Sequence, residues 1–264
     1  MAKVRLDTLL AQRGLFPSRA RAAASVMAGE VRLGASGQRA AKPGQLVAGD
    51  ELITVDERPR HVSRGGTKLE NALTALGIDV AGRRCLDVGA STGGFTDCLL
   101  QRGAAHVVAL DVAYGELAWS LREDPRVTVL ERVNARSLMP DQLPYAPDLV
   151  VADVSFISLT KVLPAVLAAC APRFDALVMV KPQFEVGRER VGRGGVVRSP
   201  ELRREAVLSV ATFARERCGA AVMGFAPSGL PGPKGNLETF VWLAEGARGG
   251  SLAELGAALE EAGA

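Results

Sequence analysis

The stretch of sequence that decides the fold runs from residue 84 to residue 100 and reads RCLDVGASTGGFTDCLL. It opens on a short apolar run, Cys85–Val88, which is typical of a buried parallel strand. A glycine-rich turn follows at once and leads into a predicted helix, Phe95–Arg102. A turn of this kind lets a ligand approach the backbone, where the first amides of the helix are free to donate hydrogen bonds. The stretch therefore predicts a strand, a ligand-binding turn and a helix in succession.

The chain that follows repeats this alternation of strand and helix. Helices are predicted between most of the strands, for example Ser158–Ala171 and Pro200–Glu216. Short apolar runs predict six further strands: Val107–Leu110, Val127–Leu130, Leu149–Val151, Leu177–Val180, Ala221–Phe225 and Phe240–Leu243. Seven strands with intervening helices predict a doubly wound, Rossmann-like α/β sheet. Such sheets bind ligands at the carboxyl ends of their strands, so the residues just after each strand are candidates for a site.

These strand-end residues favour a nucleoside-type ligand. The turn differs from the dinucleotide fingerprint Gly-x-Gly-x-x-Gly, because Ser91 stands in place of the second glycine. Asp87 favours S-adenosylmethionine, whose amino group needs a carboxylate and which has no pyrophosphate. Asp111 ends the second strand, 22 residues after Gly89, where a carboxylate can bind both ribose hydroxyls, and Asn134 is a candidate for the adenine edge. The predicted cofactor contacts are Asp87, Gly89, Ala90, Ser91, Thr92, Gly93, Gly94, Phe95, Asp111, Val112, Asn134 and Asp153.

Four ionisable residues stand in apolar surroundings at the ends of predicted elements. Asp153 closes the fourth strand, Lys181 closes the fifth and Glu238 opens the seventh, while Lys68 lies at the start of a helix before the sheet. We expect the four side chains to converge at one edge of the sheet. Buried charges need partners, and two lysines with two carboxylates can satisfy one another. The alternative is that the four residues form unrelated surface salt bridges. The apolar runs directly before Asp153 and Lys181 argue against it.

The first sixty residues differ from the others in charge. They carry ten Lys and Arg against six Asp and Glu, whereas residues 61–264 carry 22 against 23. A small basic unit joined to a larger, near-neutral one suggests contact with an anionic polymer, with a solvated basic surface as the alternative. Leu6, Leu9 and Leu10 predict a helix that stops at Gly14, and Ser18 is the predicted cap of a second helix. A period of two then predicts a small sheet.

This basic segment resembles the S-four-type RNA-binding domain, which is named after a ribosomal protein of the small subunit. The resemblance rests on Arg5-Leu6-Asp7, Gly14-Leu15, Ser18-Arg19, Gly29-x-Val31, Lys42-Pro43 and Gly49-Asp50. In that family the second helix and the following turn lie on structured RNA. The resemblance therefore implies a small α+β domain whose RNA contacts include Arg5, Arg19, Arg21, Arg32 and Lys42.

A boundary between two domains is predicted at Glu57–His61, which has no periodicity and contains a proline. The expected division is a small domain over residues 1–57, a linker over 58–62 and the α/β domain over 63–248. We expect His61 to be an exposed linker residue. Residues 249–264 are expected to form a helix or a fraying tail.

The glycine-rich turn and the order Lys68, Asp153, Lys181, Glu238 resemble the FtsJ-like ribose 2′-O-methyltransferases. Further segments make the chain similar to the TlyA family, a group of ribosomal RNA cytidine 2′-O-methyltransferases that are also called haemolysins: SRGGTKL, LDVGASTGGFTD, VVADVSFISL, VKPQFEVGR and LPGPKGN. The resemblance implies that the four residues form a catalytic tetrad, with S-adenosylmethionine as cofactor and ribosomal RNA or ribosomal subunits as partner. Ser91-Thr92 departs from the wider FtsJ-like pattern, in which many members have a proline before the paired glycines.

A ribose hydroxyl becomes a good nucleophile only when a base removes its proton. No histidine lies in these motifs, so Lys181 is the candidate base, with Asp153 acting through water as the alternative. Gly187–Arg204 holds six arginines and suits phosphate contact, unless Glu189 and Glu201 neutralise it as a solvated loop. Arg64, Arg188 and Arg193 are further candidates for RNA contacts. Phe156, Phe184 and Phe240 are candidates for stacking on a base or for core positions, and Trp119 is expected in the core.

Composition argues against several other classes of protein. The four cysteines form no Cys-x-x-Cys pair and there are two histidines, so we expect reduced thiols and no metal site. The longest apolar run, Val162–Pro172, is about half the length of a membrane-spanning helix, and residues 1–15 lack the apolar core of a signal peptide. These features predict a cytoplasmic protein, or one exported without a conventional signal. The rival functions are a membrane-active cytolysin, a non-catalytic ribosome-binding protein and a dinucleotide-dependent oxidoreductase. The sequence leaves the oligomeric state open.

Overall fold

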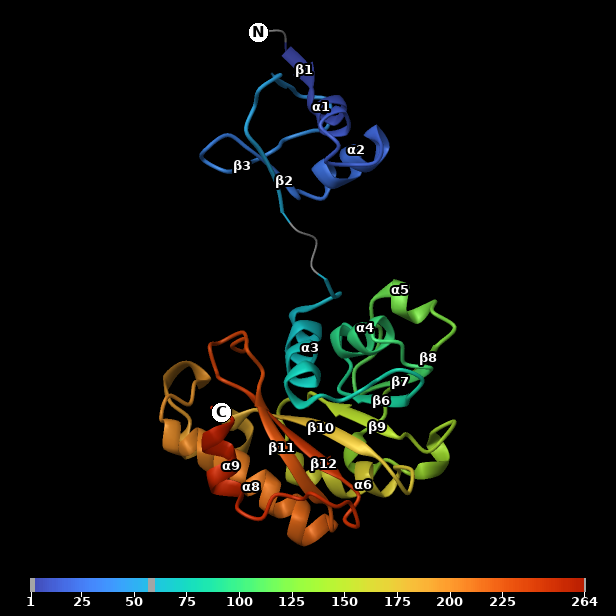
Figure 1. Ribbon diagram of the computed structural model, residues 1–264, viewed down its shortest axis with the longest axis vertical. Coiled ribbons are helices and arrows are strands. Elements are labelled where there is room, and N and C mark those ends of the chain that lie inside the picture. The colour runs from blue at the N-terminus through green and yellow to red at the C-terminus, as the bar shows by residue number, and fades with distance from the viewer. Residues whose placement is uncertain (1–2, 57–59, 264) are drawn as a thin grey trace. The chain divides into compact units, whose positions relative to one another are not determined.

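A computed structural model of the chain describes residues 3–56 and 60–263. The chain divides into two compact units, residues 1–59 and residues 60–264, which are described separately below (Figure 1). The division falls within the segment 58–62 that the sequence predicts as a linker, although residues 57–59 lie outside the described part.

The first unit contains two helices and two small antiparallel sheets. Its elements are β1 (Lys3–Arg5), α1 (Leu6–Gln12), α2 (Arg19–Met27), β2 (Val31–Leu33), β3 (Gln38–Arg39), β4 (Leu46–Ala48) and β5 (Ile53–Val55). β1 pairs with β4, and β2 lies between β3 and β5. Leu6, Leu10 and Val31 are fully buried in its core. The Ser18 side chain accepts a hydrogen bond from the Arg21 backbone amide at 3.2 Å, which makes it the N-cap that the sequence predicts.

The second unit is built on one sheet of seven strands, as the sequence predicts. The strands are β6 (Arg84–Val88), β7 (His106–Asp111), β8 (Val127–Glu131), β9 (Leu149–Ala152), β10 (Asp175–Val180), β11 (Ala221–Pro227) and β12 (Thr239–Ala244). Their order is β11-β12-β10-β9-β6-β7-β8. Only β12 runs antiparallel to its neighbours, a reversal that the apolar pattern did not show. Because Thr239 lies opposite Val180, the start of β12 meets the carboxyl ends of the parallel strands.

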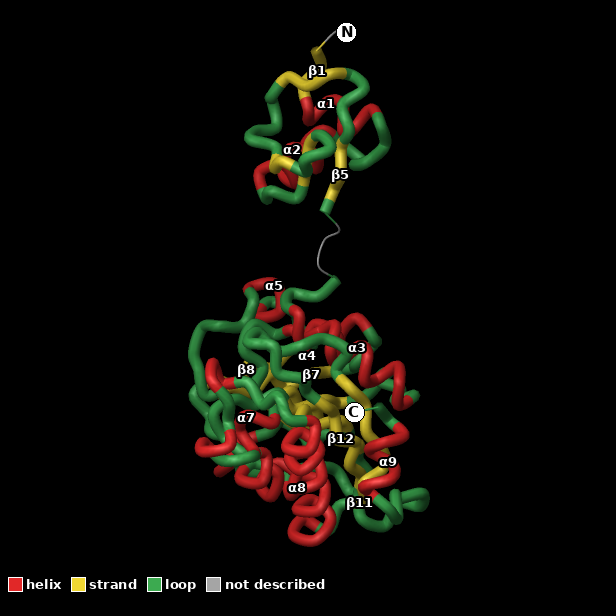
Figure 2. Tube along the Cα trace, turned by 90° about the vertical axis from the view of Figure 1, so that its left-hand side faces the viewer, coloured by secondary structure: helices red, strands yellow, loops and turns green. Residues whose placement is uncertain are grey.

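Helices cover both faces of this sheet (Figures 1 and 2). One layer contains α3 (Arg64–Leu76), α4 (Gly94–Gln101) and the short α5 (Trp119–Arg122), and the other contains α6 (Leu163–Ala168), α8 (Pro200–Cys218) and α9 (Leu255–Glu261). α7 (Pro182–Glu185) follows β10 directly. Alternate strand residues enter the two cores, so Leu177 packs toward α3 and α4 while Val178 packs toward α8. Both faces of the sheet are therefore buried, which explains the continuous apolar runs.

Two expectations about single side chains are wrong. Trp119 is 72% exposed instead of buried, because the one-turn helix α5 uses Leu121, together with Leu117 before it, to cover Gly93. His61 is 3% exposed instead of lying free in a linker. Its ring packs where Gly66 lacks a side chain, and the Val62 amide donates to Asp97 Oδ2 at 2.8 Å. The segment from residue 60 onward therefore belongs to the second unit.

The described residues include no helix that is long and apolar enough to cross a membrane. All four cysteines are free thiols, and Cys85 and Cys98 are buried.

Candidate active site

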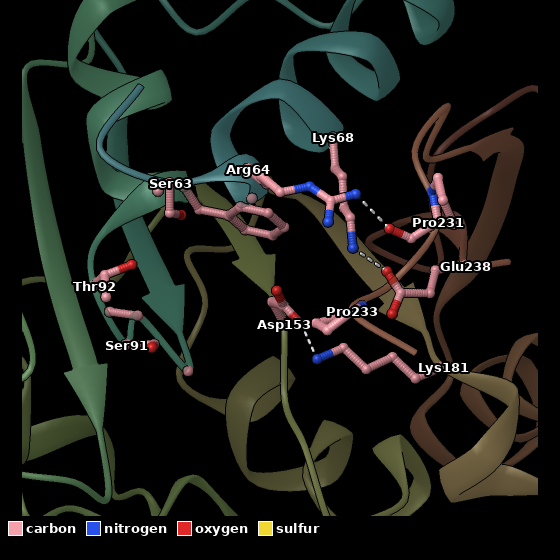
Figure 3. A pocket seen from close by; sticks show the side chains of 15 residues that line it. Ser63, Arg64, Lys68, Ser91, Thr92, Asp153, Lys181, Pro231, Pro233 and Glu238 are labelled. Carbon is pink, nitrogen blue, oxygen red and sulfur yellow. Dashed lines mark hydrogen bonds and ion pairs between the residues drawn. The ribbon is translucent and has the colours of Figure 1, made fainter. Parts of the chain in front are cut away.

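A cavity of about 480 Å³ opens at the carboxyl edge of the sheet (Figure 3). The glycine-rich turn forms one wall with Gly89, Ala90, Ser91, Thr92, Gly94 and Phe95. All four residues of the predicted tetrad line the same cavity, as do Arg64 and the two prolines of the loop before β12. Residues that are up to 170 positions apart in the chain are thus brought to one place.

The four charged residues form two ion pairs. Lys68 on α3 pairs with Glu238 at the start of β12, and both side chains are almost completely buried. Lys181 at the end of β10 pairs with Asp153 at the end of β9, in a more open position. The Lys181 ammonium also donates to Ser155 Oγ at 2.8 Å. The alternative of four unrelated surface salt bridges is wrong, because the pairs share one cavity wall and balance one another's charge.

Two glycines are needed for the close packing of the turn. Gly89 has φ +84°, and a Cβ there would lie 2.6 Å from the carbonyl oxygen of Asp153. A Cβ on Gly94 would collide with the side chain of Ser63. The turn therefore packs closely against the Asp153 backbone at Gly89 and against Ser63, just before α3, at Gly94.

Asp87 lies beneath the turn instead of lining the cavity. Its side chain has no exposed surface, and Oδ2 accepts hydrogen bonds from the Thr96 amide at 2.9 Å and the Thr96 hydroxyl at 2.7 Å. Within the described chain, Oδ1 is buried without a hydrogen-bond partner. Burial raises the pKa of this carboxyl to about 7. Asp87 therefore supports the start of α4 from inside, and its contact with the cofactor amino group stays a prediction.

Four other predicted cofactor residues lie outside the lining of the 480 Å³ cavity: Gly93 in the turn itself, and Asp111, Val112 and Asn134 after β7 and β8. Asp111 accepts hydrogen bonds from the Ser91 amide and the Ala113 amide, both at 2.8 Å, so its carboxylate is fixed beside the turn. Val112 is 65% exposed. Asn134 is exposed, and its side-chain oxygen accepts from the Arg136 amide at 3.0 Å, which caps a 3-10 turn.

A second cavity of about 690 Å³ adjoins the first and shares Lys181, Pro233 and Glu238 with it. Phe156 and Phe184 line it, with ring centroids 5.3 Å apart. Phe156 is 92% exposed, whereas Phe240, the third phenylalanine that the sequence singled out, is fully buried in the core. Two aromatic rings thus face an open cavity next to the tetrad lysine.

The predicted RNA-binding residues fall into two groups. Arg5 and Arg19 both pair with Asp7, and the hydrogen bonds from Arg5 hold the pKa of that carboxyl well below its usual range. Arg32 pairs with Asp56. Arg21 and Lys42 are exposed and have no ion pair within residues 3–56. Three of the five side chains therefore carry a structural partner.

In the second unit, Arg64 reaches across the first cavity and donates to the Pro231 carbonyl oxygen at 2.9 Å. Arg188 lines the second cavity, and Arg193 is exposed on the loop that follows. Within residues 60–263, neither Glu189 nor Glu201 forms an ion pair with a loop arginine: Arg190 pairs with Glu205, and Glu201 accepts from Ser199 Oγ.

His61, Glu70 and Cys98 form a buried group that the sequence did not reveal. Their nitrogen, oxygen and sulfur atoms lie within 4.8 Å of one another, and neither ring nitrogen of His61 has a hydrogen-bond partner among the described residues. Both Glu70 oxygens accept hydrogen bonds from Arg102 at 2.9 Å. Arg102 thus supplies the positive charge that a metal ion would bring.

The family model of the FtsJ-like methyltransferases matches residues 61–245. The chain belongs to this family. It is 55% identical over 243 residues to the 16S/23S rRNA (cytidine-2'-O)-methyltransferase TlyA of Mycobacterium tuberculosis, covering 91% of this chain and 90% of that relative. It is 37% identical to Hemolysin A of Brachyspira hyodysenteriae, over 89% of this chain and 97% of the relative. The resemblance to the TlyA family is therefore confirmed, and the chain is a methyltransferase.

A solved structure of a hemolysin from Streptococcus thermophilus has the same fold. Its TM-score to this chain is 0.74 at 37% identity, and the alignment covers 100% of this chain and 96% of that one. Methyltransferase and hemolysin names thus both occur among relatives that span nearly the whole chain.

Proposed function

We propose that the chain transfers a methyl group from S-adenosylmethionine to the ribose 2′-hydroxyl of a cytidine in ribosomal RNA, in the cytoplasm. The observation that carries this proposal is the cavity in which two lysine–carboxylate pairs face the glycine-rich turn. The name of the 55% identical relative supports the substrate. Methyl transfer to a hydroxyl needs a bound methyl donor, a base and a positioned acceptor, and each has a candidate place around this cavity.

The residues of the turn fit S-adenosylmethionine. Gly89 and Gly94 let the turn pack closely against Asp153 and Ser63, and α4 begins at Gly94, so its first amides lie beside the cavity. The fixed Asp111 carboxylate beside Ser91 has lone pairs left for ribose hydroxyls. When bound, the cofactor supplies an electrophilic methyl group on a positive sulfur.

Lys181 acts as the base in this proposal. A neutral Lys181 amine removes the 2′-proton as the oxygen attacks, while Asp153 and Ser155 orient the amine. Lys68, held by Glu238, supplies a positive charge near the reacting oxygen or an adjacent phosphate. In the alternative, Asp153 is the base and acts through a water molecule. The methyl-transfer rates of Lys181→Ala and Asp153→Asn distinguish the two assignments.

The second cavity receives the acceptor nucleoside. Phe156 and Phe184 offer aromatic faces for the base, while Arg188 and Lys234 on the same wall suit its phosphates. The cavity touches Lys181, which is where the 2′-hydroxyl must arrive.

Replacing Phe156 by alanine is expected to weaken acceptor binding. Loss of one base-stacking ring removes about 1–3 kcal/mol, so KM for the ribosomal substrate should rise by roughly 5- to 160-fold. Affinity for S-adenosylmethionine should stay unchanged, because Phe156 does not line the first cavity. Steady-state kinetics and a cofactor titration check both parts, with Phe156→Tyr as the control that keeps a ring.

The first unit is proposed as the S-four-type RNA-binding domain over residues 1–57, preceding a methyltransferase domain over 63–248. The segment 249–264 is proposed as a C-terminal helix or tail, and α9 (Leu255–Glu261) lies in it. Of the five predicted RNA-binding residues of the first unit, Arg21 and Lys42 have no ion pair within residues 3–56, and we assign these two to phosphate contacts. Arg5, Arg19 and Arg32 hold Asp7 or Asp56 as well, so their contribution to RNA binding is reduced by the partner carboxylate.

Arg21→Ala is therefore expected to weaken binding of ribosomal subunits more than Arg32→Ala. Removal of one phosphate contact lowers the slope of log affinity against log salt by about 1. Filter binding of the full chain at several salt concentrations measures that slope. Equal slopes for the two variants would contradict the assignment.

The direct test of the function is transfer of labelled methyl groups to separated ribosomal subunits. Label at a ribose of a cytidine supports the proposal and identifies the subunit. A protein that binds S-adenosylmethionine but labels neither subunit would contradict the proposed substrate.

A membrane-active function is the second candidate, because relatives named hemolysin span nearly the whole chain. Erythrocyte lysis by the wild type and by Lys181→Ala separates the two functions. Lysis that is equal in both would show an activity independent of the methyltransferase site.

A further inference from the structure

The loop between β9 and the 3-10 turn Leu159–Lys161 carries both a tetrad residue and an aromatic wall of the second cavity. Asp153 begins this loop, and Phe156 stands at its tip. Phe156 has φ +64°, in the left-handed region that side chains other than glycine adopt at a cost in energy. An exposed ring in a strained backbone keeps one position only where the surrounding structure holds the loop.

The residue before α7, Lys181, and the last residue of α7, Glu185, hold the loop on either side of Phe156. Before the tip, Ser155 Oγ accepts from the Lys181 ammonium at 2.8 Å. After the tip, the Glu185 carboxylate accepts from Ser158 Oγ at 2.6 Å and from the Leu159 amide at 2.9 Å. Because Lys181 and Glu185 are four residues apart, a single turn of helix fixes both ends of the strained segment.

Both carboxylate oxygens of Glu185 accept hydrogen bonds from this loop. No Lys or Arg pairs with it in the two described segments of the chain, and its burial raises the pKa of the carboxyl. A partly buried carboxylate without a cation is unusual, because desolvation disfavours it. Its contacts with the loop are what compensate for that burial.

We propose that Glu185 is a positioning residue that holds Phe156 and the acceptor nucleoside against Lys181. The inference rests on the proposed function, since it assigns the second cavity to the acceptor. Glu185 itself does not line that cavity, so it acts through the loop. With Glu185 in place, the ring of Phe156 is in position before RNA arrives, and the ordering of the loop need not occur during binding.

The test compares Glu185→Ala, which removes both contacts, with Glu185→Gln, which keeps an acceptor oxygen for the Leu159 amide. Glu185→Ala should raise KM for ribosomal subunits about 10-fold and lower kcat by a similar factor, as a displaced acceptor requires. Glu185→Gln should stay within about threefold of wild type, and affinity for S-adenosylmethionine should hold in both. Glu189→Ala, an exposed carboxylate four residues on, is the matched control.

A measurement without RNA tests the loop itself. The Leu159 amide donates to Glu185, and the amides of residues 160–162 donate within the turn that follows. These amides should exchange with deuterium at least 10-fold faster in Glu185→Ala than in wild type, Glu185→Gln or Glu189→Ala. Ser158→Ala removes one of the two contacts and should show a smaller increase, which guards against misfolding of the alanine variant. Unchanged exchange and unchanged kinetics in Glu185→Ala would overturn the inference. Faster exchange with a wild type that methylates neither subunit would overturn the proposed function alone.

Discussion

Lys181→Ala is expected to lower the rate of methyl transfer about 10³-fold while the protein still binds S-adenosylmethionine. General-base catalysis contributes about 10²- to 10⁴-fold. Among the described residues Lys181 is the lysine that lines both cavities, whereas Lys68, paired with buried Glu238, lines the first and Lys234 lines the second. Single-turnover transfer to ribosomal subunits at saturating cofactor isolates the chemical step from binding. Cofactor affinity should change little, because the turn and Asp111 are untouched.

The matched control is Lys161→Ala, which removes an exposed lysine of the same unit from outside both cavities. Asp153→Asn separates the two assignments of the base. If Lys181 is the base, Asp153→Asn disturbs its orientation and costs less than Lys181→Ala. A larger loss in Asp153→Asn than in Lys181→Ala would instead make Asp153 the base through water. A Lys181→Ala protein with near wild-type single-turnover rates would overturn both assignments.

The central features of the site could be predicted because each leaves a local mark in the sequence. A charged residue directly after a run of buried strand residues, as at Asp153 and Lys181, lies at the carboxyl edge of the sheet, and that edge is where the structure brings them together. The turn after β6 is equally local, since its shape depends on glycines at Gly89 and Gly94. Glu238 lies at the same edge for a different reason. It precedes β12, and because β12 runs antiparallel to β10, the start of β12 lies beside the end of β10.

Other features depend on packing between distant segments and leave no such mark. His61 follows a proline and looks like linker, yet the missing side chain of Gly66 creates the space that buries it. The acidic residue before a glycine turn suggests a ligand contact, but the pattern does not show that Asp87 is completely buried and accepts hydrogen bonds from Thr96. The role of Glu185 is invisible in the same way, since its partners are 26 and 27 residues away.

Asp87 carries the second large prediction, an inverse dependence of stability on pH. Its pKa is about 7 in the folded protein and about 3.9 in an unfolded chain, so between these values the folded state binds more protons. The free energy of unfolding from this group therefore falls as pH rises from about 4 to about 7 and is constant above that. At 1.36 kcal/mol for each pKa unit, the full change is roughly 4 kcal/mol at most.

Asp87→Asn removes the ionisation but keeps an oxygen that can accept from the Thr96 amide and hydroxyl. We expect the variant to be more stable than wild type by roughly 2–4 kcal/mol at pH 8 and to gain nothing at pH 4, where wild-type Asp87 is protonated in the fold. Urea unfolding followed by tryptophan fluorescence measures this difference. Both tryptophans, Trp119 and Trp242, lie in the second unit, so the signal reports the unit that contains Asp87.

The informative quantity is the difference in free energy of unfolding between Asp87→Asn and wild type at each pH. Other carboxyls make the stability of both proteins rise with pH, so the pH dependence of one protein alone does not isolate Asp87. Hydrogen bonds from Arg102 to Glu70 and from Arg248 to Glu245 lower the pKa of each glutamate to about 2, so their stabilisation is lost only as pH falls through that range. Those contributions are common to both proteins and cancel in the difference.

The matched control is Asp141→Asn, at an exposed carboxyl, which should have the same free energy of unfolding as wild type at both pH values. If Asp87→Asn raised the free energy of unfolding equally at pH 4 and pH 8, the substitution would act through packing and not through ionisation. A loss at pH 8 would mean that the ionised carboxylate is stabilised, contrary to its buried and unpartnered Oδ1.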